Sequence, residues 1–228
     1  MSDDADTGEG DGAAVDAPVP EVDPHDYLAD DPYLGPVVAE FGELGLDPAA
    51  DAFQRLVVSI IRQQVSMASA AATRERLFDA VEVTPEGIRG AADETLKEAG
   101  LSGQKTRYVN EIADAFHEHG WTRADFEAMS DDEVRETLTA ITGVGPWTAE
   151  MFLLFVLGRP DVFPVGDLGV REGLKTLLDP HAVDAESMTR GEMRAFAERW
   201  APVRSYATLY LWRVTEDIVA DVGEVVEE

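Results

Sequence analysis

Asp167 is the residue whose type and place most favour chemistry. It stands between an extended loop, residues 159–166, and an apolar periodic segment that predicts a helix over residues 168–178. Asp is a favoured helix N-cap, worth about 1 kcal/mol, and a helix N-terminus favours a negative charge. A carboxylate can stabilise a developing positive charge or orient an attacking water molecule. A simple cap and a catalytic group both agree with the local sequence.

The segment before that loop, residues 138–149, has the glycine spacing of a tight hairpin between two helices. Gly143 and Gly145 flank one apolar residue, Val144, and Pro146 occupies the first position of the next predicted helix. Glycine allows a positive φ and a close backbone approach, and proline at a helix start lacks only an N–H that would be unpaired anyway. The N–H groups at such a helix start can bind a phosphate without side-chain charge. A hairpin used only for packing is the alternative.

The chain carries 46 acidic residues against 18 Lys and Arg, a formal net charge of −28. This acidity argues against a nucleic-acid ligand, because DNA-binding proteins usually present a basic face. Two explanations compete: a cationic partner, or a halophilic surface adapted to molar salt, where charges are screened within about 3 Å. Because the acids are spread over nearly every predicted helix face, we favour adaptation to salt. The absence of cysteine excludes disulfides, a thiolate nucleophile and an iron–sulfur cluster.

The elements that must position these residues are helices. Residues 1–26 are acidic and lack Lys and Arg, which predicts a disordered tail. From residue 27 onward the apolar residues recur with helical spacing, and Ser66, Ser130 and Thr189 stand where N-caps are expected. Helices are predicted over residues 104–119 and 204–219 among others, and no alternating strand pattern occurs, so the fold class is all-α. No apolar run reaches the roughly 18 residues of a membrane span and no secretory signal is visible; we expect a cytoplasmic protein without membrane contact.

Several motifs together resemble the helix-hairpin-helix, Gly/Pro-rich-loop and Asp (HhH-GPD) superfamily of DNA glycosylases, and its 3-methyladenine DNA glycosylase II branch in particular. They are Pro146–Ala149 after the hairpin, Val162–Pro164 before Asp167, Phe53–Ala72 with Ile61–Ser66, Gly100–Ser102 with Lys105, and Phe196–Trp212. The resemblance covers about residues 30–218.

This resemblance implies a two-lobed helical glycosylase domain, residues 27–220, with the active site in the cleft between the lobes. One lobe would comprise about residues 50–165 and include the hairpin. The other would combine residues 27–49 with residues 167–220. Some longer relatives carry an additional N-terminal β-rich domain, for which the roughly 30 residues before Pro32 leave no room.

For the reaction, the resemblance assigns Asp167 as the catalytic residue, since it matches the family's catalytic Asp. The implied activity is hydrolysis of the N-glycosidic bond of an alkylated purine that has been flipped out of double-stranded DNA, a step of base excision repair. Bifunctional relatives carry a hairpin lysine that forms a Schiff base and leads to strand cleavage. Trp147 stands at that position here, so we expect base release alone. We expect a monomer without cofactor or metal; a monovalent cation held by hairpin carbonyls is an open alternative.

The resemblance also implies aromatic side chains around the flipped base. Trp147 and Trp212 match family aromatics that line the pocket, and Tyr206 is a third candidate. An alkylated purine is cationic, and a ring face attracts a cation with roughly 0.5 to 2 kcal/mol. Each tryptophan could equally be a core aromatic. Met151 stands where some relatives have an aromatic residue, which leaves the breadth of substrates open.

Contacts to DNA are implied at five further positions. Gln64 matches the family's wedge, which fills the gap that a flipped base leaves; an ordinary polar loop residue is the alternative. The backbone amides of Gly143 and Gly145 and the hydroxyl of Thr148 would contact phosphate. Lys105 is a further candidate, unless it belongs only to the exposed face of its helix.

Two rival functions remain open at this point. A non-catalytic DNA-binding protein would use the hairpin as a backbone clamp and would not need Asp167. A glycosylase for deaminated, oxidised or mismatched bases would share the fold. Relatives that act on oxidised or mismatched bases usually carry a hairpin lysine or an iron–sulfur cluster, and this chain has neither.

Overall fold

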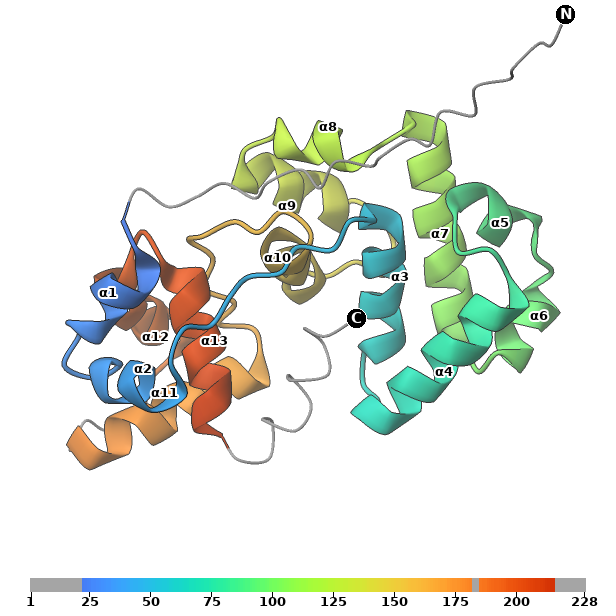
Figure 1. Cartoon of the computed structure of the whole chain (residues 1–228). Coiled ribbons are helices and arrows are strands. Elements are labelled where there is room, and N and C mark those ends of the chain that lie inside the picture. The colour runs from blue at the N-terminus through green and yellow to red at the C-terminus, as the bar shows by residue number, and fades with distance from the viewer. Residues whose placement is uncertain (1–21, 182–184, 216–228) are drawn as a thin grey trace, which may run out of the picture.

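The computed structural model describes residues 22–181 and 185–215, and within these ranges it contains helices and no strands (Figure 1). The helices are α1 Pro24–Ala29, α2 Gly35–Phe41, α3 Ala52–Arg62, α4 Met67–Ala80, α5 Pro85–Gly90, α6 Asp93–Glu98, α7 Gly103–His119, α8 Arg123–Glu127, α9 Asp131–Thr139, α10 Pro146–Phe155, α11 Leu168–Leu178, α12 Arg190–Ala197 and α13 Arg204–Val214. The predicted all-α class is confirmed. None of the described helices is both long and apolar enough to span a bilayer.

The helices form two lobes with α10 between them (Figure 1). One lobe contains α3 to α9, and the other contains α1, α2 and α11 to α13. Residues 42–51 cross from the second lobe to the first, and both ends of this crossing are held. The Tyr210 hydroxyl donates to the Gly42 carbonyl at 2.7 Å, and the Ala49 amide donates to the Phe155 carbonyl at 2.7 Å.

Local sequence explains where many of these helices begin and end. The Ser66 hydroxyl accepts the Ser69 amide at the start of α4. Ser130 and Thr189 form reciprocal capping boxes at the starts of α9 and α12, and Gly120, with φ of 63°, ends α7 in the left-handed conformation. Each of these signals acts within one helical turn, and the corresponding predictions are confirmed.

The loop that carries Asp167 is fastened to α13. It follows α10, whose side chains Phe152, Leu153 and Leu154 are almost completely buried in the core. The Arg204 guanidinium pairs with the Asp161 carboxylate at 2.7 Å. The Ser205 hydroxyl accepts the Val162 amide at 2.9 Å and donates to the Arg159 carbonyl at 2.6 Å. These bonds hold residues 159–162 of the loop against α13.

Two predicted ends differ from the structure. The tail was predicted to extend through residue 26, whereas α1 already begins at Pro24, because Asp23 accepts the amides of His25 and Asp26 and Leu28 is completely buried. The last helix was predicted to reach residue 219, whereas α13 ends at Val214 and is followed by an extended residue. The remainder of the predicted tail, residues 1–21, and residues 216–220 lie outside the described residues.

Candidate active site

Asp167 is held by three N–H donors. It is the N-cap of α11, and its Oδ1 atom accepts the Val170 amide at 3.0 Å. The same oxygen accepts the indole N–H of Trp212 at 3.0 Å, and Oδ2 accepts the indole N–H of Trp147 at 2.8 Å. The side chain is partly exposed. Because every partner is a donor, the arrangement suits a charged carboxylate that remains accessible to a ligand.

The backbone before Asp167 is also fixed. Its amide donates to the Pro164 carbonyl at 2.8 Å. One terminal nitrogen of Arg171 donates to the carbonyls of Val165, Gly166 and Asp167 at 3.1, 2.7 and 3.0 Å. The Arg171 guanidinium therefore binds three successive backbone carbonyls. The side-chain carboxylate of Asp167 binds the two tryptophans instead. The position of the carboxylate depends on the loop and on both helices that it joins.

The tryptophans come from different helices. Trp147 lies in the first turn of α10, and Met151 follows one turn later on the same face, where it is buried. Trp212 of α13 is buried and stacks on Phe155, with ring centroids 5.8 Å apart and an angle of 15° between the planes. The structure therefore brings Trp147 and Trp212 to Asp167, where their N–H groups bond the carboxylate. Their predicted contacts with a flipped base remain a prediction.

Tyr206 of α13 packs against α1. Its ring packs edge-on against His25 of α1, with centroids 5.7 Å apart, and burial raises the pKa of its hydroxyl. Trp212 is six residues further along α13, which turns the two side chains about 120° apart on the helix. Tyr206 thus supports the contact between α1 and α13, and its predicted contact with a flipped base remains a prediction.

The hairpin glycines have different environments. Gly143 has φ of 98°, and a Cβ atom there would lie 2.2 Å from the Tyr108 ring. Gly145 is the N-cap of α10; no side chain caps this helix, and a Cβ on Gly145 would meet no atom within 4 Å. Val144 between them is buried. The ring packing requires a glycine at the first position, and the open space at the second lets an acceptor approach the amides of α10.

Gln64 has the only left-handed backbone of a non-glycine residue within the described ranges, with φ of 58°, and its side chain is exposed. The neighbouring Gln63, which the sequence analysis did not select, donates from its amide to the Gly143 carbonyl at 3.1 Å and to the Thr148 hydroxyl at 3.3 Å. The Thr148 side chain is only 1% exposed. Its hydroxyl therefore orients Gln63, and the predicted contact of this hydroxyl with phosphate is corrected.

Lys105 bonds the end of α3, just before Gln63 and Gln64. Its ammonium group donates to the Ile61 carbonyl at the end of α3, and burial lowers the pKa of this side chain. The bond fixes the helix end that precedes Gln63 and Gln64. Contact between Lys105 and DNA remains a prediction.

Glu150 is a second carboxylate near Asp167 that the sequence analysis missed. One of its oxygens, Oε2, lies 3.8 Å from the position that a Cβ on Gly166 would take. Burial raises the pKa of Glu150, and the charges of Arg135 and Arg194 oppose this while that of Asp167 adds to it. Only its spacing of one turn from Trp147 could have indicated it in the sequence.

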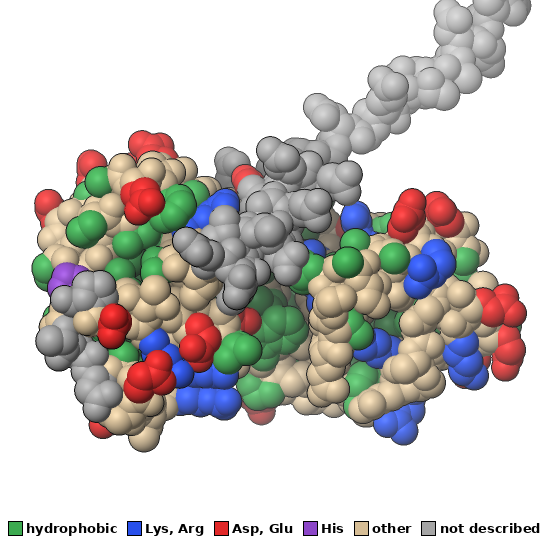
Figure 2. Space-filling view, turned by 90° about the horizontal axis from the view of Figure 1, so that it is seen from below, with side chains coloured by type: hydrophobic (Ala, Val, Ile, Leu, Met, Phe, Trp, Pro, Cys, Tyr) green, Lys and Arg blue, Asp and Glu red, His purple; other side chains and the backbone are tan. Residues whose placement is uncertain are grey.

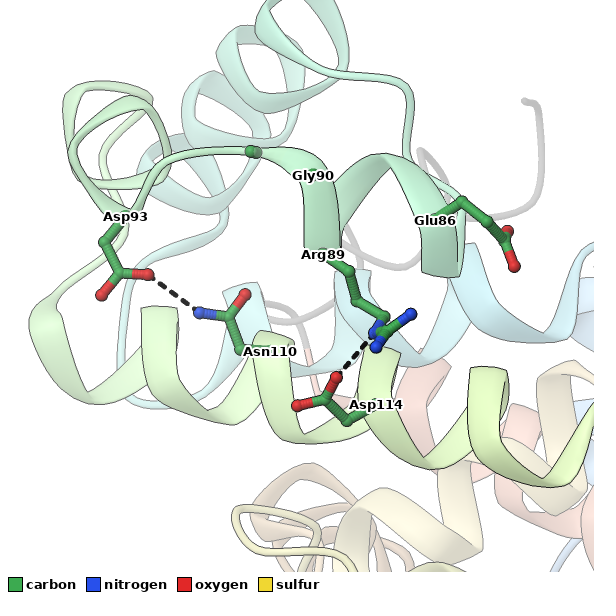
Figure 3. A pocket seen from close by; sticks show the side chains of 7 residues that line it. Glu86, Arg89, Gly90, Asp93, Asn110 and Asp114 are labelled. Carbon is green, nitrogen blue, oxygen red and sulfur yellow. Dashed lines mark hydrogen bonds and ion pairs between the residues drawn. The ribbon is translucent and has the colours of Figure 1, made fainter.

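The molecule is hollowed between the lobes on the face seen in Figure 2. Hydrophobic side chains form the floor of the hollow, and Lys and Arg side chains lie on the lobes at either side. A separate hollow of about 550 Å³ lies between α5, α6 and α7 (Figure 3). Arg89 pairs with Asp114 at 2.7 Å and the Asn110 amide donates to Asp93 at 3.0 Å across it, and its lining includes none of the predicted site residues. Within the described ranges, no group of three or more His, Asp or Glu side chains could hold a metal ion.

Comparison with known proteins agrees with this geometry. The family model of the HhH-GPD superfamily base excision DNA repair protein matches residues 57–202. DNA-3-methyladenine glycosylase 1 of Schizosaccharomyces pombe is 32% identical over 170 residues, which cover 72% of each chain. The chain spans 56% and 60% of the length of two other curated relatives, from Bacillus subtilis and Schizosaccharomyces pombe.

Two solved structures have the same fold. The DNA-3-methyladenine glycosidase of Bacillus halodurans superposes with a TM-score of 0.72 at 32% identity, covering 89% of this chain and 94% of that one. The 3-methyladenine DNA glycosylase of Schizosaccharomyces pombe in complex with abasic DNA superposes with a TM-score of 0.74 at 29% identity, covering 83% and 95%. The chain therefore belongs to the HhH-GPD superfamily of base excision DNA repair proteins.

Proposed function

We propose that this protein is a monofunctional DNA N-glycosylase that hydrolyses the glycosidic bond of alkylated purines in double-stranded DNA. The observation that carries the proposal is the Asp167 carboxylate, held by the N–H groups of Trp147, Trp212 and Val170. The carboxylate stands beside a glycine hairpin whose second helix begins without a side-chain cap.

The chemistry follows from the position of that charge. As the bond between C1′ and the purine nitrogen breaks, its electron pair leaves with the base and positive charge develops on the sugar. A fixed carboxylate stabilises this charge more effectively than water does, because it needs no reorganisation. A water oxygen then bonds to C1′, and its proton passes to the carboxylate and on to solvent. An alkylated purine is cationic before the bond breaks, so it leaves as a neutral base without an acid.

The absence of a lysine from the hairpin supports hydrolysis without strand cleavage. The chain has three lysines, Lys97, Lys105 and Lys175. None lies in the hairpin, and the amine of Lys105 is engaged by the Ile61 carbonyl. Bifunctional relatives carry their Schiff-base lysine at the position of Trp147, and the indole N–H of Trp147 bonds Asp167 instead. We expect an intact abasic strand as the product.

The substrate class is supported by the relatives, several of which are named as 3-methyladenine glycosylases. The indole N–H groups of both tryptophans are used by Asp167, so recognition of the base by these residues would use their ring faces. Ring faces favour a cationic purine. We expect a monomer that acts on duplex DNA, with Gln64 inserted where the base leaves.

The test is a base-release assay with the wild type and the Asp167→Asn variant. Both proteins are incubated with methylated duplex DNA at low and at molar KCl, and the released bases are separated by chromatography. The proposal predicts free alkylpurine from the wild type alone, and strand breaks only after alkaline treatment. Equal release by both proteins would remove Asp167 from its role. DNA binding without release by the wild type would favour a non-catalytic DNA-binding protein.

A further inference from the structure

Among the residues that the structure describes, Arg55 is a partly buried cation without an anionic partner. It lies on α3, and its guanidinium carbon is 4.8 Å from the centroid of the Phe155 ring. Its Nε atom is buried and has no hydrogen-bond partner, and within the described parts of the chain its guanidinium makes no ion pair. Elsewhere arginines do pair, as Arg89 does with Asp114 and Arg204 with Asp161. The lack of a described carboxylate beside Arg55 sets it apart from these two arginines.

The electrostatic environment makes this position costly. Burial first, and then the charges of Arg62 and Arg74, lower the pKa of Arg55 to about 10. The side chain is still cationic at neutral pH. A partly buried charge without a partner destabilises the free protein, and two further cations nearby add repulsion. An anion bound at this site would compensate the unpaired charge of Arg55 and reduce its repulsion with Arg62 and Arg74.

The location of Arg55 indicates which anion this is. Phe155, on which Arg55 lies, stacks in turn on Trp212, and Trp212 bonds Asp167. The guanidinium is therefore linked to the proposed catalytic carboxylate through two stacked rings, Phe155 and Trp212. Arg62 follows seven residues later on the same face of α3, about 10 Å along the helix, immediately before Gln63 and Gln64. The face of α3 with Arg55 and Arg62 thus leads from the aromatic stack to the predicted wedge.

We propose that Arg55 binds a backbone phosphate of the damaged strand next to the flipped nucleotide, a contact that rests on the proposed glycosylase function. The Phe155 ring holds the plane of the guanidinium, so that its two terminal nitrogens can donate together to two phosphate oxygens. A phosphate is the anion that every substrate brings to this place. Because the contact is short and partly buried, salt screens it less than it screens long-range attraction, which suits a protein of this acidity.

The experiment measures the dissociation constant for duplex DNA that contains a non-cleavable abasic analogue, by fluorescence anisotropy over a series of KCl concentrations. The variants are Arg55→Gln and Arg55→Lys, with Arg89→Gln as the matched control from the paired cluster of Figure 3. We expect Arg55→Gln to weaken binding roughly tenfold to a hundredfold and to reduce the salt slope by about one. Arg55→Lys should lose less, and Arg89→Gln should bind like the wild type.

A second set of duplexes identifies the phosphate. Each carries one uncharged methylphosphonate linkage, moved stepwise across the damaged site. The proposal predicts one linkage that weakens binding by the wild type and has no effect on Arg55→Gln. Wild-type affinity of Arg55→Gln, or equal sensitivity of both proteins at every linkage, would overturn it. Melting temperatures establish that the variants fold, and the same comparison with Arg55→Lys applies if Arg55→Gln does not.

These experiments distinguish a failure of the phosphate contact from a failure of the proposed glycosylase function. If the wild type released no base but one methylphosphonate lost its effect in Arg55→Gln, the glycosylase proposal would fail and the phosphate contact would stand. If the wild type released base and no linkage depended on Arg55, the phosphate contact alone would fail.

Discussion

Two helices begin at the proposed active site, and their N-termini are used in opposite ways. α10 begins at Gly145, and no side chain caps its first amides. α11 begins at Asp167, whose carboxylate caps the Val170 amide and accepts two indole N–H groups. Both helix dipoles favour a negative charge at this end. One N-terminus is left open for an anion of the DNA, and the other fixes an anion that belongs to the protein.

The largest effect is expected from Asp167→Asn, which keeps the N-cap of α11 but removes its negative charge. Asparagine caps helices as well as aspartate does, so the cap of α11 should be kept, and the free energy of unfolding should fall by about 1 to 3 kcal/mol because the new amide nitrogen cannot accept an indole N–H. It removes the negative charge, and base release should fall by roughly 10²- to 10⁴-fold. Single-turnover release and thermal melts measure the two effects. Asp51→Asn is the matched control, since Asp51 caps α3 by accepting the Gln54 amide at 2.8 Å, and it should release base at the wild-type rate.

The next variant gives α10 the cap that α11 already has. Gly145→Asp has space for its side chain, and the backbone of Gly145, at φ −93° and ψ 173°, suits an N-cap. The new carboxylate should stabilise the protein by about 0.5 to 2 kcal/mol while repelling phosphate. We expect affinity for abasic-analogue DNA to fall at least about tenfold. Gly145→Ser adds a neutral cap and should lose less. Unchanged affinity in Gly145→Asp would show that the hairpin does not contact phosphate.

A smaller effect concerns the indole bonds that distinguish α11. Trp212→Phe keeps a ring to stack on Phe155 but removes the N–H that Asp167 accepts. A hydrogen bond to a charged group is worth about 1.5 to 3 kcal/mol, so base release should fall at least about tenfold. Trp200→Phe is the control, because the indole N–H of buried Trp200 has no partner, and its release rate should be unchanged. Equal rates for both variants would contradict a positioning role for Trp212.

The smallest effect is on stability and involves Glu150. Burial raises its pKa above the ordinary value of 4.5, so the folded state binds this proton more tightly than the unfolded state does. Ionised Glu150 therefore reduces stability at neutral pH, and the penalty disappears as pH falls through the raised pKa toward 4.5. Glu150→Gln should melt above the wild type at pH 7, and the difference should shrink as the pH is lowered. A constant difference would contradict this assignment.

Local signals in the sequence predicted much of the fold. The capping serines and the hairpin glycines act within a few residues, so the helix starts and the turn at residues 143–145 could be identified without tertiary information. Asp167 and Trp212 were selected through family resemblance, but their hydrogen bond joins residues 45 positions apart. Neither propensity nor periodicity encodes such a contact.

The contacts that could not be predicted also arise from packing between distant segments. Tyr206 and Trp212 share a helix, and only packing against α1 decides that Tyr206 faces His25. The hydroxyl of Thr148 was expected, through the family resemblance, to contact phosphate, but the residue is buried and the Gln63 amide donates to this hydroxyl inside the protein. Arg55 could not be recognised as unpaired, because its neighbours come from α10 and α4.

The bond between Gln63 and the Gly143 carbonyl connects two tasks that DNA repair must coordinate. The residue that follows Gln63 is the predicted wedge, and Gly143 belongs to the turn expected to grip the strand. If the turn at Gly143 moved to the next phosphate, Gln64 would move with it. Insertion of the wedge beside a base and binding of the backbone would then occur in one step. A search along undamaged DNA would then test each nucleotide at a constant distance from the phosphate that is being held.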